Sequence, residues 1–260
     1  MKIKKIFRKA KSKLFSNNIF PASIDQGLLI RQAAEFFNLP LESVHERFED
    51  YRLFSMENRY SETFGERKTL SFEEAFLLYL AVLLLQPRSV VEIGTQYGKS
   101  TRRILDLLKF AGLEACQVTC FDIKNQVKYF SHDEAHLVIQ DVSNDFRFRV
   151  LEQLEPGLIF LDAHPYRLLF NAVTEFLNWS STHSSILAIH DCSPLLYNPR
   201  MKINKGELDK ITSQTGVWER HVLSEVFTIP NVSLDDISTS TYRSKIFKTQ
   251  HGLALIMPKR

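Results

Sequence analysis

Short apolar runs alternate with segments of helical periodicity from about residue 88 onward. Five of these runs are "SVVEI" at 89, "QVTCFD" at 117, "HLVIQD" at 136, "GLIFLD" at 157 and "SILAIHD" at 185. Apolar runs of this length are typical of strands buried on both faces, and helical segments between them indicate parallel pairing. The pattern therefore predicts an α/β fold, a doubly wound sheet with helices on both faces, including a helix over residues 99–110.

The best-defined helical pattern is "SFEEAFLLYLAVLLLQP", which begins at Ser71. Ser71 can cap this helix, Glu74 can complete a capping box, and Pro87 ends it. The segment is apolar nearly all round, so we expect it to be buried. Residues 22–65 carry apolar positions at three- and four-residue spacing, which predicts further helices.

Two late segments are predicted to be strands. "RHVLSEVFTI" starts at residue 220 and "GLALIMP" at residue 252. We expect them to pair in antiparallel fashion at the edge of the sheet.

These patterns divide the chain into three parts, with boundaries at residues 20 and 86. Residues 1–20 form a basic amphipathic tail, residues 21–86 a helical extension, and residues 87–260 an α/β domain. We expect the helical extension to cover a substrate, with a second wall from residues 192–210, which follow the fifth strand.

Basic charge is concentrated at the amino end of the chain. The first 13 residues hold seven of the 33 basic residues and no acid, while the whole chain has 30 acidic residues. The remainder of the chain is therefore mildly acidic, and nucleic acid is not an indicated partner.

Two interpretations of the tail stay open. Ile3, Phe7, Ala10 and Leu14 recur at helical spacing between lysines, which favours a short helix on an anionic membrane surface formed by residues 1–15. A solvated terminus fits equally well. No apolar h-region follows the tail, and the three cysteines form no paired framework, so we expect a cytoplasmic protein, membrane-associated on the cytoplasmic face if the tail binds lipid.

The predicted parallel strands share a chemical feature at their carboxyl ends. Each ends in, or carries near its end, a carboxylate, and these are Glu92, Asp122, Asp141, Asp162 and Asp191. In open parallel sheets, ligands bind outside the carboxyl ends of the strands. The five carboxylates therefore predict a ligand site at one edge of the sheet.

The glycine segment "VVEIGTQYGKST" at 90–101 follows the first strand. Only three residues separate Gly94 from Gly98, whereas a phosphate-binding P-loop needs four. Gln96 stands where a dinucleotide fold would have its second glycine. Nucleotide hydrolysis is therefore excluded, and a tight turn between a strand and a helix remains.

Together, the glycine turn and the carboxylates make residues 85–257 resemble a class I S-adenosylmethionine-dependent methyltransferase. In motif, the chain is most similar to metal-dependent O-methyltransferases of small molecules and sugars. The resemblance implies a Rossmann-like, seven-stranded sheet of order 3-2-1-4-5-7-6. It also implies a cofactor site around the methionine part (Glu92, Gly94, Thr95, Gly98 and Ser100), at the ribose (Asp122) and at the adenine amino group (Asp141).

The same resemblance implies a catalytic group at the fourth and fifth strands. Asp162 and Asp191 match carboxylates that hold Mg²⁺ near the acceptor, and His164 matches a histidine that acts as a general base. Two departures leave a metal-independent reaction open. "Asp-Ala-His" is one residue shorter than the family's Asp-Gly-x-His, and His190 stands where some relatives have another acidic ligand.

The function implied is methyl transfer from S-adenosylmethionine to a hydroxyl of a small molecule or glycan, with Mg²⁺ as a second cofactor in the metal-dependent case. N-methylation stays open, because the donor site does not report the acceptor. The alternative is a non-catalytic protein of the same fold that binds a partner or a membrane. The sequence does not determine the oligomeric state.

Overall fold

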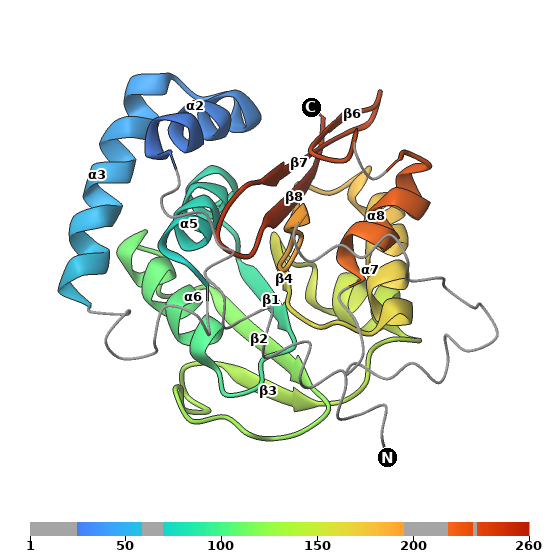
Figure 1. The fold of residues 1–260 in the computed structure, drawn as a ribbon. Coiled ribbons are helices and arrows are strands. Elements are labelled where there is room, and N and C mark those ends of the chain that lie inside the picture. Colours follow the sequence, from blue (N-terminus) through green and yellow to red (C-terminus); the bar gives the residue numbers. More distant parts are fainter. Residues whose placement is uncertain (1–24, 59–69, 195–217, 231–232, 260) are drawn as a thin grey trace, which may run out of the picture.

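The computed structural model describes residues 25–58, 70–194, 218–230 and 233–259 (Figure 1). The basic tail lies outside these ranges, and so do residues 195–210 of the second wall predicted over 192–210. One sheet crosses the middle of the molecule, with helices on both of its faces. Its strands are β1 Ser89–Ile93, β2 Gln117–Asp122, β3 His136–Ile139, β4 Leu158–Leu161, β5 Ile186–Ile189, β6 Asp236–Ser238, β7 Tyr242–Phe247 and β8 Leu253–Pro258.

The strand order is β3-β2-β1-β4-β5-β8-β7-β6. The five predicted strands pair in parallel, and β8 joins β5 in antiparallel fashion. The predicted Rossmann-like fold is therefore confirmed, with eight strands in place of seven because the short β6 adds one at the edge. The chain order reverses between β1 and β4, which makes the carboxyl end of this strand pair the topological switch point.

One predicted strand is wrong. Residues 219–227 form the helix α8 (Glu219–Phe227), and the antiparallel partners of β8 are β5 and β7. The apolar pairs Val222–Leu223 and Val226–Phe227 recur four residues apart, which is a helical spacing. Val222 and Leu223 are buried against the core, so tertiary packing selects the helical periodicity over the strand propensity of these residues.

The other helices are α2 Gln26–Phe37, α3 Leu41–Glu57, α5 Phe72–Leu85, α6 Lys99–Phe110, the π-helix η2 Arg147–Glu152 and α7 Tyr166–Ser180. Helices α5 and α6 cover one face of the sheet, with α2 and α3 packed outside α5, while α7, α8 and η2 cover the other face (Figure 1). The predicted helices over 71–87 and 99–110 are confirmed. Within the described ranges, no helix is both long and apolar enough to cross a membrane.

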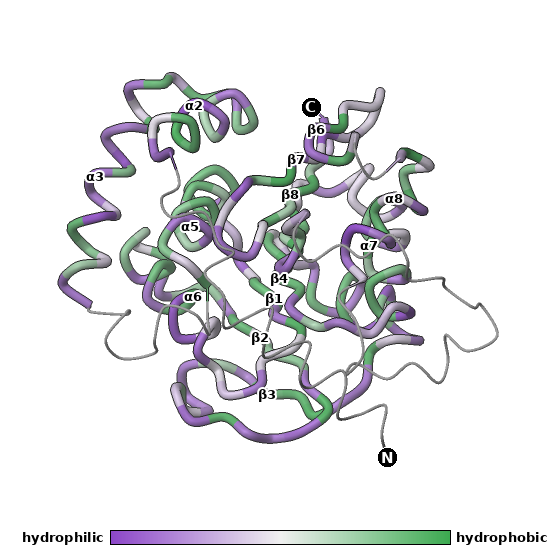
Figure 2. The backbone as a smooth tube through the Cα atoms, viewed as in Figure 1, coloured by the Kyte–Doolittle hydropathy of each residue, from purple (hydrophilic) through white to green (hydrophobic). Residues whose placement is uncertain are grey.

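Helix α5 shows how sequence sets a helix boundary. The Ser71 side chain accepts a hydrogen bond from the backbone of Glu74, and the Glu74 carboxylate accepts one from the backbone of Ser71, as in a capping box. The helix ends at Gln86, which adopts a left-handed conformation just before Pro87. Its apolar surface is buried, and Figure 2 shows it as one of the most hydrophobic helices.

The core has two halves, one on each face of the sheet. Successive side chains of β1 point to opposite faces, so Val90 joins the half beneath α5 and α6 while Val91 joins the half beneath α7. Aromatic side chains pack the outer helices α2 and α3 against the half of the core beneath α5 and α6. Phe48 of α3 makes edge-to-face contacts with Phe72 and Phe76, at ring-centroid distances of 5.3 and 5.0 Å.

Because Phe48 is buried between α3 and α5, we expect Phe48→Ala to lower the free energy of unfolding by about 3–5 kcal/mol. Chemical denaturation followed by circular dichroism measures this change. Leu53→Ala, at a position on the same helix that is 55% exposed, is the matched control and should change stability little. Near-equal stability of the two variants would show that α3 is not part of the cooperative core.

Candidate functional site

The carboxyl edge of the parallel sheet gathers the predicted site residues in a fixed order. Register pairs Ile93 of β1 with Phe121 of β2 and with Leu161 of β4. Asp122 therefore ends β2 and Asp162 directly follows β4, and these are the two strands that flank β1. The site has two sides that meet at the switch point, one formed by β1–β3 and one by β4–β5.

Gly94 lies where the two sides touch. Its φ of 95° is left-handed, and a Cβ at this position would collide with the carbonyl oxygen of Asp162. Both the backbone conformation and the close approach require glycine. The turn is held further by the Gly94 N–H, which donates to the carbonyl of Phe121 at 2.9 Å.

Gly98 opens helix α6 and is covered by the loop that follows β2. Its φ is 81°, and a Cβ would lie 2.7 Å from the ring of Phe130. The Lys128 N–H donates to the carbonyl of Tyr97 at 3.0 Å, and the Lys128 ammonium lies 5.0 Å from the Tyr97 ring centroid. The glycine turn and the loop over residues 123–130 are thus packed together as one unit.

Glu92 and Ser100 are buried beneath this turn. Oε1 of Glu92 accepts a hydrogen bond from the Ser100 hydroxyl, and Oε2 accepts one from Thr101. Burial raises the pKa of Glu92 to about 7, although these hydroxyls oppose the shift. In this geometry Glu92 and Ser100 support the turn from within, and Thr95 is likewise buried.

Asp122 and Asp141 lie at the ends of β2 and β3 and face outward more than Glu92 does. The Asp122 carboxylate accepts the N–H of Gln96 at 2.7 Å and that of Lys124 at 3.0 Å. Asp141 is exposed and accepts the N–H of Ser143 at 2.8 Å. Both carboxylates fix local turns and keep further acceptor positions, because an ionised carboxylate can accept about four hydrogen bonds.

At the ends of β4 and β5, Asp162, His190 and Asp191 come together. Nδ1 of His190 lies 3.1 Å from Oδ1 of Asp162 and 3.4 Å from Oδ1 of Asp191. Asp191 has a left-handed φ of 61°, a conformation that aspartate tolerates better than most residues. Burial alone would lower the pKa of His190, but the carboxylates around it raise it well above its usual value.

His164 joins this group through a carboxylate that the sequence analysis missed. Nδ1 of His164 lies 2.8 Å from Oε1 of Glu219, and Nε2 lies 3.6 Å from Oδ2 of Asp191. Burial lowers the pKa of His164, but the hydrogen bond and the charge of Glu219 outweigh it and raise the value to about 9. Burial raises the pKa of Glu219 to about 7. Glu219 begins α8, directly before the segment wrongly predicted as a strand, and no local pattern marks it as a site residue.

Glu74 reaches the same site from helix α5. Its fully buried carboxylate lies 3.3 Å from Nε2 of His190 and accepts the Thr249 hydroxyl at 2.7 Å and the His251 N–H at 3.0 Å. The capping box identified Glu74 only as a helix cap. His251 was detectable in principle, because the antiparallel β8 begins at the edge where β5 ends.

Two groups of side chains among the described residues could hold a metal ion. One is Asp162, His190 and Asp191, and the other is Glu74, His190 and His251, with ligand atoms within 4.8 Å of one another in each group. The predicted carboxylate pair Asp162 and Asp191 converges as a divalent cation requires. The residues present therefore fit such a cation, with His190 as an additional neighbour.

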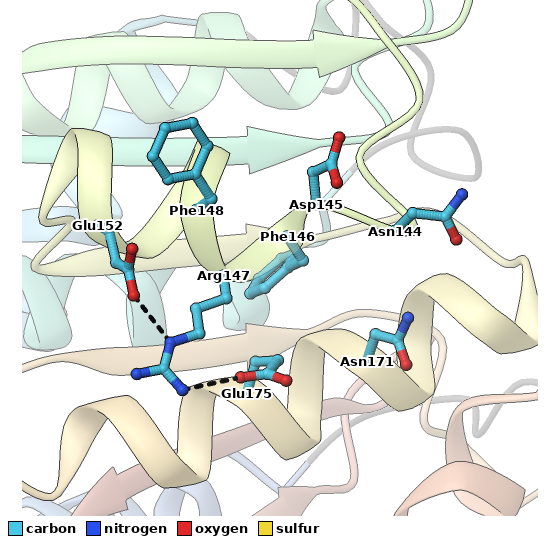
Figure 3. Close-up of a pocket in the computed structure, with 8 residues that line it drawn as sticks. All are labelled: Asn144, Asp145, Phe146, Arg147, Phe148, Glu152, Asn171 and Glu175. Carbon is cyan, nitrogen blue, oxygen red and sulfur yellow. Dashed lines mark hydrogen bonds and ion pairs between the residues drawn. The ribbon is translucent and has the colours of Figure 1, made fainter.

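A separate pocket of about 250 Å³ lies between η2 and α7 (Figure 3). Arg147 crosses it between Glu152 and Glu175, at 2.8 and 3.6 Å from their carboxylates. None of its eight lining residues is a predicted site residue. Among these lining residues, Arg147 carries the only positive charge, and two carboxylates already pair with it. This pocket is therefore distinct from the site at the carboxyl edge of the sheet.

Comparison with known proteins agrees with the fold. Residues 91–192 match the family model described as a methyltransferase domain. This range runs from β1 through the glycine turn to the end of β5, so it contains both sides of the site. No curated protein matches the chain in sequence.

Solved structures resemble the chain only distantly. SAH-bound methyltransferase PaMTH1 from Podospora anserina is 14% identical, with a TM-score of 0.49 over 92% of this chain and 99% of that one. The O-methyltransferase TomG from Streptomyces achromogenes, with SAM, is 15% identical, with a TM-score of 0.41 over 96% of each chain. A structure titled "cmcI-D160 Mg-SAM" is 25% identical, with a TM-score of 0.35 over 44% of this chain and 50% of that one.

A side chain at Gly94 would be unfavourable for two reasons, namely the positive φ and the contact with Asp162, and a comparison with Gly112 separates the two. Gly112 also has a positive φ, 71°, but a Cβ there would meet nothing within 4 Å. We expect Gly112→Ala to destabilise the protein by about 1–2 kcal/mol through backbone strain alone. Gly94→Ala should cost about 2 kcal/mol more, because the new methyl group must displace the Asp162 backbone. Equal losses in thermal unfolding would refute the close approach of the two sides.

Proposed function

We propose that this chain, whose residues 91–192 match the model of a methyltransferase domain, transfers a methyl group from S-adenosylmethionine to a hydroxyl of a small-molecule acceptor. The observation that carries the proposal is the junction at Gly94. There a glycine turn flanked by Asp122 abuts Asp162, which belongs to a cluster of acid and base side chains. A methyl donor on one side and an acceptor on the other would meet at the switch point.

On the donor side, Asp122 is proposed to accept the two ribose hydroxyls, and Asp141 to lie beside the adenine amino group. Ile123 follows Asp122 and is 60% exposed, which leaves an apolar surface suited to a flat purine ring. Gly94, Thr95 and Gly98 would shape the turn around the methionine part. Glu92 and Ser100 are proposed to act from beneath, by holding this turn in place.

On the acceptor side, His164 is proposed as the general base. Glu219 holds Nδ1, which leaves Nε2 toward Asp191 and the edge of the sheet. In the metal-free protein the pKa of His164 is near 9, so His164 carries a proton at neutral pH. It must release this proton before it can accept one from the acceptor, so transfer should accelerate as the pH rises toward 9. A cation on Asp162 and Asp191 would offset the charges that raise this pKa and would move the rise in rate to lower pH.

Asp162 and Asp191 are proposed to hold a divalent cation. When bound, such a cation would lower the pKa of an acceptor hydroxyl and help to orient it. Nδ1 of His190 lies 3.1 Å from one of these carboxylates and 3.4 Å from the other, so His190 holds both in place from within the protein. A glycan acceptor fits this chemistry as well as a smaller alcohol does, since either presents a hydroxyl.

Binding of S-adenosylhomocysteine tests the donor side. Asp122→Ala should weaken this binding by about 1.5–3 kcal/mol, the range for a hydrogen bond to a charged group. Isothermal titration calorimetry measures the change, and Asp133→Ala, in an exposed part of the loop that follows, is the matched control. Unchanged affinity in a folded Asp122→Ala variant would remove the ribose assignment. No binding by the unaltered protein would favour a non-catalytic role.

His164→Ala tests the acceptor side. Loss of a general base should slow methyl transfer by roughly 10²–10⁴-fold and should abolish the rise in rate with pH, while affinity for S-adenosylhomocysteine stays nearly unchanged. His45→Ala, an exposed position on α3, serves as the control. Full activity of His164→Ala on an acceptor that the unaltered protein methylates would exclude His164 as the base.

A further inference from the structure

We infer that the site formed by Asp162, His190 and Asp191 binds a transition-metal dication such as Mn²⁺ or Co²⁺ more tightly than Mg²⁺, with Nδ1 of His190 as a direct ligand. The inference rests on the proposed function in one respect, namely that the two carboxylates hold a cation. It goes further by naming the class of metal and the nitrogen ligand that selects it.

The spacing of the three donor atoms fits one cation. Nδ1 of His190 lies 3.1 Å from Oδ1 of Asp162 and 3.4 Å from Oδ1 of Asp191. Neighbouring ligands bound about 2.1 Å from a metal are separated by about 3.0 Å in octahedral geometry and about 3.4 Å in tetrahedral geometry. The observed separations fall in this range. A bound cation would replace the Nδ1 proton, because both lie between the same two carboxylates.

The far side of the imidazole is arranged as in metal-binding histidines. Such a histidine nearly always donates its other ring N–H to a carboxylate, which fixes the ring and makes the ligating nitrogen more basic. Nε2 of His190 faces Oε2 of Glu74 at 3.3 Å. Glu74 is itself fixed by the Ser71 and His251 backbones and by the Thr249 hydroxyl. Glu74 and His190 therefore already have the arrangement that a carboxylate and a metal-binding histidine adopt.

The donor set decides the class of metal. Mg²⁺ prefers hard oxygen ligands and keeps several waters, so an imidazole nitrogen adds little to its binding. Imidazole suits the later first-row metals, whose affinity for sites containing nitrogen rises along the series from Mn²⁺. One nitrogen beside two carboxylates should therefore favour Mn²⁺ and Co²⁺ over Mg²⁺.

Direct metal binding tests this inference without an acceptor. The full chain, freed of metal with chelator, is titrated separately with Mn²⁺, Co²⁺ and Mg²⁺. We expect Mn²⁺ and Co²⁺ to bind at least about tenfold more tightly than Mg²⁺. Pulsed electron paramagnetic resonance of the Mn²⁺-loaded protein should show coupling to an imidazole ¹⁴N, a signature that needs no variant.

His190→Asn replaces the nitrogen ligand with an amide oxygen near the position of Nδ1. The preference for Mn²⁺ over Mg²⁺ should fall about tenfold in this variant, while the matched control His132→Asn, on an exposed loop, keeps it. Circular dichroism checks that each variant is folded. S-adenosylhomocysteine titration of the same samples reports on the donor side independently, so a failed metal inference is distinguishable from a failed methyltransferase assignment.

Three results would overturn the inference. The first is affinity for Mg²⁺ equal to or greater than that for Mn²⁺ in the unaltered protein. The second is the absence of ¹⁴N coupling when Mn²⁺ is bound. The third is the absence of binding by any of the three metals.

Discussion

The close approach of Gly94 to the backbone of Asp162 is the constraint on which the rest of the site depends. Parallel pairing of β1 with β4 brings the two segments to the same edge, and only a residue without a Cβ allows them to touch there. The other side chains of the site lie on one side of this contact or on the other. The glycine turn and Asp122 lie toward β2, while the acid and base side chains lie toward β5.

Buried charges hold together the side of the site formed by β4 and β5. Glu74 is fully buried, and His190 beside it keeps the pKa of Glu74 well below its usual range despite burial. Burial of a lone carboxylate would be costly, but this one has partners from α5, β5 and the segment before β8. The network therefore ties the helical layer to the sheet at the site itself. The helical extension thus contributes a side chain to this cluster as well as to the core.

His164 and His190 differ in how tightly carboxylates hold them. Nδ1 of His164 lies 2.8 Å from Glu219, but its Nε2 lies 3.6 Å from Asp191, beyond hydrogen-bond distance. His190 is buried, and each of its nitrogens has a carboxylate oxygen within 3.3 Å. The first arrangement suits a group that exchanges a proton with a ligand. The second suits a group whose position and bonding are fixed, as a metal ligand requires. Two histidines in one cluster are therefore assigned different roles on geometric grounds.

The sequence by itself determined the parallel sheet, the capped helix over 71–87 and the row of strand-end carboxylates, because each depends on local periodicity or on the end of a strand. Only the tertiary structure decided that residues 219–227 are helical, since packing selected between two periodicities. It also decided the partners of the site. Glu74 and Glu219 lie 88 residues before and 57 residues after Asp162 in the chain, and no local pattern indicates which distant carboxylate will face which histidine. That pairing follows from the packing of α5 and α8 against the sheet, which is a property of the whole fold.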